Sequence, residues 1–174
     1  MPTLVLDPPP AEFERILDQR RRAGADRHDE VWEGVLHMAP APSHKHGRLV
    51  IELALLLAPP AKAAGLEITD EINLGGSEYD YRVPDLALHR PGAAPIWHPT
   101  AALIVEIVSP GDETQNKLPF YAAHHVEELL IVDPDRCTSQ WLALGADGNY
   151  RQVQGSALID LTASELDARI EWPA

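Results

Sequence analysis

The stretch LIVEIV, residues 103–108, decides the fold. Apart from Glu106 it is entirely apolar, and it belongs to a longer run that begins at Ala101. A nearly continuous apolar run of this length is typical of a central strand that is buried on both faces of a sheet. A second run of this kind, Leu129-Leu130-Ile131-Val132, is followed at once by Asp133-Pro134. The sequence therefore predicts two buried strands near the centre of one sheet.

The segment before these strands supplies a helix and two further strands. Apolar residues with helical spacing predict a helix over about 43–58, which Pro59-Pro60 should bend or end. Alternating apolar residues predict a strand over 66–74. A second strand is expected over 81–89, although Pro84 interrupts it.

The segment between the two buried strands predicts the second helix. It spans about 112–125, and its regular part is expected to start near Asn116, so that Pro119 falls in the first turn. A turn is expected at 75–77. The order over the core, about residues 43–133, is then helix-strand-strand-strand-helix-strand, which predicts a mixed α/β (α+β) sheet.

Shorter patterns flank this core. We expect a helix over 11–23, a hairpin over 29–39, strands over 139–144 and 149–154, and a short helix near 162–168. A chain of 174 residues has the usual length of one domain, so residues 1–174 are expected to form a single domain.

Composition narrows the class of protein. Fourteen Lys and Arg against 27 Asp and Glu give a net charge of −13, whereas nucleic-acid binders usually carry a basic footprint. The longest apolar run, residues 53–58, is too short for a membrane span. The first residues lack a basic region followed by an apolar run, so a cytoplasmic protein without membrane contact is expected.

Glu106 and Asp85 are the acidic residues that stand out. Glu106 is the charged residue inside the most apolar strand, and a lone buried carboxylate costs several kcal/mol unless it is paired or bound to a metal. Asp85 precedes Leu86-Ala87-Leu88 and follows Pro84, where the strand should bend. Two carboxylates on adjacent strands suit Mg²⁺, and a backbone carbonyl such as that of Ile107 could supply a third ligand.

A structural interpretation of the same residues stays open. Glu106 could pair with an arginine such as Arg82, and Asp85 could bond to backbone groups. Lys117, one of only three lysines in the chain, follows the Glu106 strand by one loop. It could be a solvated surface residue, or it could point back over the strand ends toward a scissile phosphate or an attacking water.

Three blocks of sequence carry a resemblance to a known family. They are RVPDLALHRP (82–91), LIVEIVSPGDET (103–114) and KLPFYAAHHVEELLIVDP (117–134), and EVWEGVLHMAPAPSHKH (30–46) supports them. Together they resemble the Uma-two family of restriction-endonuclease-like proteins, a branch of the PD-(D/E)XK nuclease superfamily. The likeness covers about residues 26–145.

The resemblance implies a restriction-endonuclease-like core and roles for particular residues. Asp85 matches the motif aspartate and Glu106 the motif (D/E). The usual lysine position, two residues after that acid, is Val108 here, and the family's lysine on the following helix is Lys117. Glu30 and His46 also match family positions, as possible secondary site residues.

The expected reaction is Mg²⁺-assisted hydrolysis of DNA phosphodiester bonds, with Mn²⁺ as a possible substitute. Cleavage of two strands usually needs two active sites, so a homodimer is expected. The acidic charge leaves two alternatives open. One is a non-catalytic or partner-dependent module that keeps the nuclease fold. A nuclease brought to DNA by a delivery protein is the active form of this alternative. The other is a metal-dependent hydrolase of a smaller phosphate ester.

Overall fold

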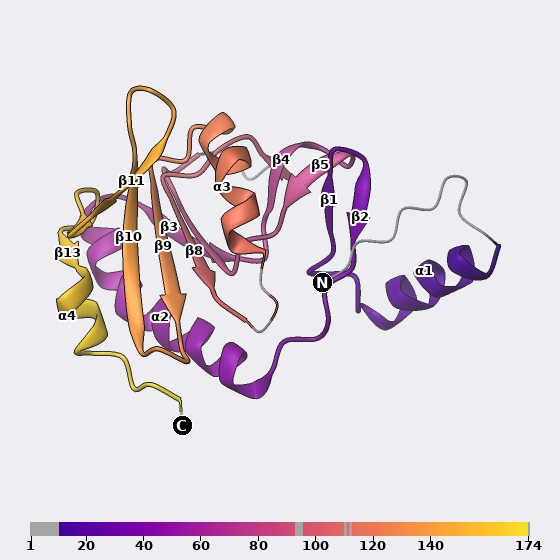
Figure 1. The fold of residues 1–174 in the computed structure, drawn as a ribbon, viewed down its shortest axis with the longest axis horizontal. Coiled ribbons are helices and arrows are strands. Elements are labelled where there is room, and N and C mark those ends of the chain that lie inside the picture. Colours follow the sequence, from indigo (N-terminus) through magenta and orange to yellow (C-terminus); the bar gives the residue numbers. More distant parts are fainter. Residues whose placement is uncertain (1–10, 93–95, 110, 112, 174) are drawn as a thin grey trace.

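The computed structural model describes residues 11–92, 96–109, 111 and 113–173. Figure 1 shows a sheet with helices on both of its faces, a smaller sheet beside it, and helix α1 projecting from the edge of the smaller sheet. The helices of the described residues are α1 (Ala11–Ala23), α2 (His44–Ala63), α3 (Thr114–Ala123) and α4 (Ala163–Asp167).

The main sheet is mixed, and its strand order is β11-β10-β9-β8-β6-β3. Strand β8 lies antiparallel to β6 and parallel to β9, while the other neighbours in this sheet are antiparallel. Its strands are β3 (Glu67–Asp70), β6 (Leu86–His89), β8 (Leu103–Ile107), β9 (Glu128–Asp133), β10 (Thr138–Leu144) and β11 (Tyr150–Val153).

A second sheet has the order β2-β1-β5-β4-β7. The sequence patterns indicated its hairpin β1–β2, which lies within the predicted range 29–39, but not the sheet as a whole. Its strands are β1 (Glu30–Trp32), β2 (Val35–His37), β4 (Asn73–Ser77), β5 (Asp80–Arg82) and β7 (Trp97–His98). Strands β12 (Gly155–Ser156) and β13 (Leu161–Thr162) form a short separate pair.

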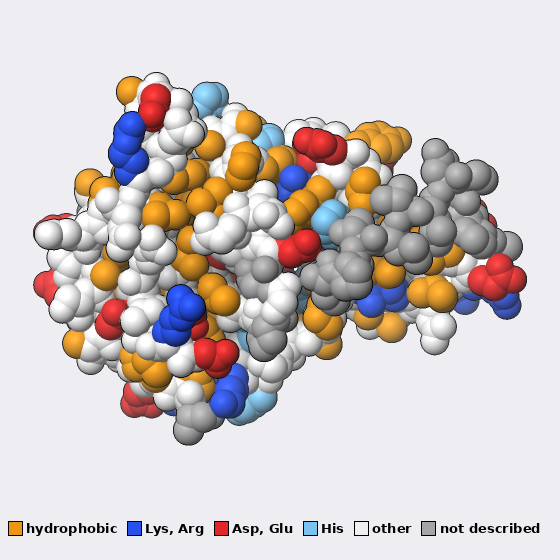
Figure 2. All heavy atoms as spheres, in the orientation of Figure 1, with side chains coloured by type: hydrophobic (Ala, Val, Ile, Leu, Met, Phe, Trp, Pro, Cys, Tyr) orange, Lys and Arg blue, Asp and Glu red, His pale blue; other side chains and the backbone are white. Residues whose placement is uncertain are grey.

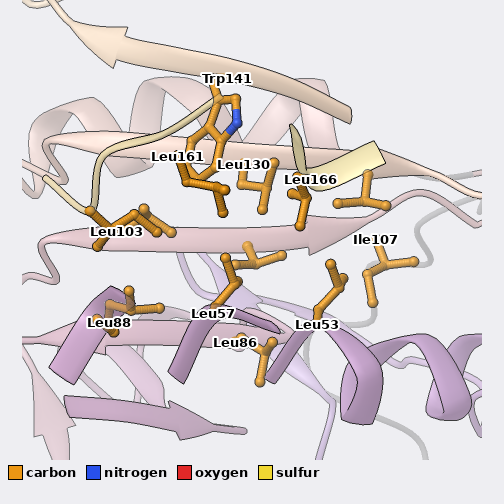
Figure 3. Close-up of a cluster of buried hydrophobic side chains, with 14 of the residues drawn as sticks. Leu53, Leu57, Leu86, Leu88, Leu103, Ile107, Leu130, Trp141, Leu161 and Leu166 are labelled. Carbon is orange, nitrogen blue, oxygen red and sulfur yellow. The ribbon is translucent and has the colours of Figure 1, made fainter. Parts of the chain in front are cut away.

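Strand β8 is buried along its whole length because helices cover both faces of the main sheet. Helix α2 packs on one face, where Leu53 and Leu57 meet Leu103 and Ile107 of β8 (Figure 3). Helix α3 covers the other face, where Tyr121 meets Ile104 of β8 and side chains of the neighbouring strands. The buried run 103–107 is thus explained by a strand between two helices, as its composition predicted.

Main-sheet elements occur along the chain as α2, β3, β6, β8, α3 and β9. The predicted order helix-strand-strand-strand-helix-strand is confirmed, and so is the mixed α+β fold class. Each of the two predicted strands that precede β8 is split, however. The segment 66–74 breaks near Glu71, which has a positive φ of 47°, so that β3 joins the main sheet and β4 the second sheet.

The second predicted strand, 81–89, is divided in the same way. Its first part is β5 in the second sheet, and its last part is β6 in the main sheet. Val83-Pro84-Asp85 connects them, because a proline supplies no N–H for a ladder. The turn expected at 75–77 is wrong: these residues end strand β4, where the register to β5 shifts in a bulge.

The sequence patterns also gave the wrong position of the prolines relative to the ends of the two main helices. Helix α2 continues through Pro59 and Pro60 to Ala63, since Leu57 and Ala61 remain buried against the sheet on either side of them. Helix α3 already begins at Thr114, so Pro119 lies inside the helix rather than in its first turn. Of the range predicted for this helix, Asp112 lies outside the described residues.

Candidate active site

The candidate site lies where β6 begins and β8 ends. The two strands pair with Leu86 opposite Val105. One further step of this antiparallel register brings Asp85 opposite Glu106, so both side chains leave the same face of the sheet. That face is the one covered by α3, because Glu106 shares its side of β8 with Ile104.

Asp85 is held by groups from two directions. Its Oδ2 accepts a hydrogen bond of 2.7 Å from the backbone N–H of Ile107, and its Oδ1 lies 2.8 Å from Nε2 of His46. His46 stands in the first turn of α2, which Ser43 caps by accepting from the His46 backbone N–H. The other ring nitrogen of His46, Nδ1, lies 3.3 Å from Oγ of Ser109. These contacts fix Asp85 at the edge of the cleft.

Glu106 is a buried carboxylate with only 5% of its surface exposed. The hydroxyl of Tyr121 donates a short hydrogen bond to its Oε1. The ammonium of Lys117 lies 3.2 Å from Oε1 and 3.3 Å from Oε2. Burial raises the pKa of Glu106 to about 7; Lys117 opposes this rise, whereas the charges of Asp85 and Glu30 add to it.

Lys117 bridges Glu106 to a second buried acid, Glu30 of strand β1. Its Nζ lies 2.9 Å from Oε1 of Glu30. Burial lowers the pKa of Lys117, but the charges of Glu106 and Glu30 outweigh it, and the net result is a raised pKa. Lys117 therefore stays protonated at neutral pH.

Glu30 is itself fixed from the second sheet. Its Oε2 accepts a hydrogen bond of 2.7 Å from the indole N–H of Trp32, and its Oε1 accepts one of 2.9 Å from the backbone N–H of Val83. Glu30 thus links the hairpin β1–β2, the β5–β6 connection and Lys117.

Arg82 does not pair with Glu106 as the structural interpretation supposed. Its Nη1 donates to the Asp80 carboxylate and to the backbone carbonyl of Val31. Its guanidinium lies over the rings of Trp32 and Phe120. Asp85, in turn, does accept from a backbone N–H, which is the part of that interpretation that the structure retains.

All six residues singled out from the sequence line one cleft of about 370 Å³, and they are Glu30, His46, Asp85, Glu106, Ile107 and Lys117. The cleft opens between the main sheet, the hairpin β1–β2 and the segment 38–43 that leads into α2. Elements far apart in the chain therefore deliver these residues to one place.

Comparison with known proteins agrees with this arrangement. The family model described as "Uma2: Putative restriction endonuclease" matches residues 10–172. The chain belongs to the Uma2 family. Among curated proteins, none matches the sequence of this family member.

A solved structure shares the fold of this Uma2 protein. It is the crystal structure of a putative nuclease belonging to DUF820 from Anabaena variabilis, with a TM-score of 0.67 and 16% sequence identity. The match covers 81% of this chain and 90% of that chain. At this level of identity the likeness establishes a shared mixed α+β fold.

The donor set of the Uma2 cleft fits a hard cation. In the described residues, no group of three or more His, Cys, Asp and Glu side chains is arranged to hold a metal ion. Asp85 and Glu106 nevertheless present carboxylates to the same cleft, and each carboxylate has room for more bonds than it accepts here. Mg²⁺ commonly takes only one or two protein carboxylates, with water and substrate oxygens completing its shell.

Sequence reasoning missed two contributors to this Uma2 site. Tyr121 was not among the residues singled out from the sequence, yet its hydroxyl donates a hydrogen bond to Glu106. The spacing gave a signal, because Tyr121 follows Lys117 by four residues and so shares its helix face. Trp32 supports Glu30 through its indole N–H, and nothing in its sequence context indicates that bond.

Within the described part of the chain, every helix falls short of the length and hydropathy that crossing a bilayer would require.

Proposed function

We propose that this Uma2 family member is a metal-dependent endonuclease that hydrolyses phosphodiester bonds of DNA. The observation that carries the proposal is the meeting of Asp85, Glu106 and Lys117 in one cleft, with the ammonium of Lys117 3.2 Å from Glu106. The family's description as a restriction endonuclease agrees with this chemistry.

The carboxylates of Asp85 and Glu106 would hold Mg²⁺, with the Ile107 carbonyl as a further ligand; Mn²⁺ suits the same oxygen donors. Bound there, the metal supplies a polarised phosphate and a water of lowered pKa. Both acids must be ionised to serve as ligands. Tyr121 and Lys117 support the ionised form of Glu106 by donating to its oxygens.

Lys117 acts in this proposal as a fixed positive charge. Its raised pKa makes it a poor general base, so its role is to stabilise negative charge that develops on the phosphate. Glu30 holds the ammonium in position from the opposite side. Because an ionised Asp85 can only accept, Nε2 of His46, 2.8 Å from its Oδ1, would donate to that carboxylate and orient it.

The electrostatics favour a DNA substrate that is presented by a partner. The net charge is −13, and Figure 2 shows Lys and Arg side chains standing apart on the visible face rather than gathered in a stripe. Non-specific DNA affinity depends on such a stripe. We infer that a delivery protein, or a second copy in a homodimer, strengthens the contact with DNA.

A cleavage assay tests the proposal. Plasmid, single-stranded and branched DNA are incubated with Mg²⁺ or Mn²⁺, using the wild type, Glu106→Ala and the control Glu127→Ala, whose side chain is exposed and pairs with Arg90. We expect metal-dependent cleavage by the wild type and the control and none by Glu106→Ala. Equal cleavage by Glu106→Ala would refute the site. Release of phosphate from a small ester without DNA cleavage would replace the proposed substrate.

A further inference from the structure

A series of contacts between planar groups runs from α3 to the cleft. The guanidinium carbon of Arg82 lies 3.9 Å from the ring centroid of Phe120 and 4.6 Å from that of Trp32. The ring of His37 then stacks on Trp32, with centroids 4.0 Å apart and an interplanar angle of 17°. Cation–π and stacking contacts of this kind fix planar groups in a defined orientation.

This series of contacts ends in the cleft. Trp32 and His37 both belong to its lining, and the His37 side chain keeps 16% of its surface exposed. Glu113, at the start of α3, lies 3.5 Å from Nδ1 of His37 and holds the ring from the side. A flat imidazole, stacked on an indole that also contacts a guanidinium, therefore lies at the wall of the cleft.

The cleft has an apolar wall as well as a charged floor. The wall is the segment from Met38 to Pro42, which consists of methionine, alanine and proline, and the floor carries Glu106 and Lys117. Both backbone polar groups of Ala39 are hydrogen-bonded: its N–H donates to Asp29 and its carbonyl accepts from Arg20. The wall is thus held in place without a ligand.

The apolar side of the cleft, with its stacking ring, suits the base of a nucleotide, and the charged side suits its phosphate. We propose that the cleft binds one unpaired nucleotide of single-stranded DNA, with its base stacked on His37 and its phosphate directed to Lys117. This inference rests on the proposed nuclease function and names the substrate class of that same site. A volume of about 370 Å³ is in the range of sites that enclose a small molecule.

An intact duplex fits these features poorly. Its bases are already stacked and paired, so it offers the cleft only phosphates and groove edges. Among the described residues that line the cleft, Lys117 is the one Lys or Arg. Stacking is sequence-tolerant and contributes about 1–3 kcal/mol per base, so it can supply the affinity that the missing basic groups do not.

Fluorescence anisotropy tests the inference separately from catalysis. Labelled oligo(dT) and a duplex of the same length are titrated with the protein, once in EDTA and once in Ca²⁺. We expect the single strand to bind more tightly than the duplex and His37→Ala to weaken its binding at least about fivefold, the smallest effect that one stacked base gives. The control is Tyr79→Ala, because Tyr79 is 68% exposed and lies outside the cleft.

A conservative variant separates stacking from charge and guards against misfolding. His37→Phe keeps a flat ring but loses the contact with Glu113, so it should bind oligo(dT) as the wild type does. Equal weakening in His37→Phe and His37→Ala, duplex binding as tight as single-strand binding, or no effect of His37→Ala would each overturn the inference. Tight single-strand binding without cleavage would leave the subsite standing and remove the nuclease proposal. Cleavage of single-stranded DNA that does not depend on His37 would remove the subsite and leave the nuclease proposal standing.

Discussion

The ammonium of Lys117 lies 3.2 Å and 3.3 Å from the two carboxylate oxygens of Glu106, and 2.9 Å from Oε1 of Glu30. One cation thus serves two buried acids that come from different sheets. The arrangement leaves the burial of Glu106 only partly compensated, which is why its pKa stays raised.

Glu106→Gln should change how stability depends on pH. The pKa of Glu106 rises from 4.5 to about 7 on folding. Between these values the folded state holds more protons than the unfolded state, so the free energy of unfolding falls as pH rises through this window. The metal-free wild type should lose about 3 kcal/mol of its free energy of unfolding across this window, and Glu106→Gln should not show this loss. Urea unfolding from pH 4.5 to 8 measures the difference.

Above pH 7 the same variant should be as stable as the wild type or more stable. Glu127→Gln is the matched control, since Glu127 is exposed and only pairs with Arg90. A loss of several kcal/mol in Glu106→Gln at pH 8 would show instead that the ion pair with Lys117 holds the fold together.

Lys117→Ala should lower turnover by roughly 10²–10³-fold, the effect of losing one preorganised charge-stabilising donor. It should also destabilise the protein by about 3 kcal/mol at pH 8, because two buried acids then face each other without a cation. Metal affinity should stay similar or rise. Cleavage kinetics, metal titration and urea unfolding measure these effects.

Lys117→Arg should restore turnover only in part, because a planar guanidinium differs from an ammonium in reach and geometry. Lys62→Ala, at the exposed end of α2, is the control and should leave both properties unchanged. Normal turnover in Lys117→Ala would remove Lys117 from the mechanism and leave the reaction to the two acids.

Asp85→Asn should abolish Mn²⁺ and Mg²⁺ binding in isothermal titration calorimetry and keep the stability within about 1 kcal/mol, because the new amide oxygen can still accept from the Ile107 N–H. Asp147→Asn, in the exposed β10–β11 hairpin, should bind metal as the wild type does. Unchanged affinity in Asp85→Asn would contradict the assignment of Asp85 as a ligand.

Arg20→Ala should loosen the cleft wall at Ala39, because Arg20 bonds both Asp29 and the Ala39 carbonyl. Asp29, with 5% of its surface exposed, would lose its cation, and the Ala39 carbonyl would lose its donor. We expect a loss of about 2 kcal/mol in thermal or urea unfolding. Arg22→Ala, on the same helix but with an exposed ion pair to Asp18, should cost less than about 0.5 kcal/mol.

The sequence predicted the order of the main-sheet elements because burial on both faces leaves a continuous apolar run, as in residues 103–107. It also singled out residues that prove to share one cleft, since a charge in such a run needs a compensating partner. It could not predict the second sheet. Strands of two to five residues such as β7 and β4 carry too little periodicity, and their sheet is set by long-range pairing.

The partner of Glu106 was open for a related reason. Sequence spacing alone does not rank Arg82 and Lys117 as candidate partners of Glu106. In the structure the guanidinium of Arg82 contacts the rings of Phe120 and Trp32 and bonds Asp80, whereas Lys117 contacts Glu106. Such a contact between α3 and the second sheet appears only in three dimensions.

The passage of the chain through Val83-Pro84-Asp85 from one sheet to the other has a consequence for folding. Glu30 and Trp32 stand on the second sheet, Glu106 on the main sheet, and Lys117 on helix α3. A folding intermediate with a formed main sheet and an undocked β1–β2 hairpin would hold the apolar contacts between α2 and β8 but lack the Lys117 bridge. We therefore expect activity to return later during refolding than the burial of Trp141, and the lag between the two to report how fast the sheets dock.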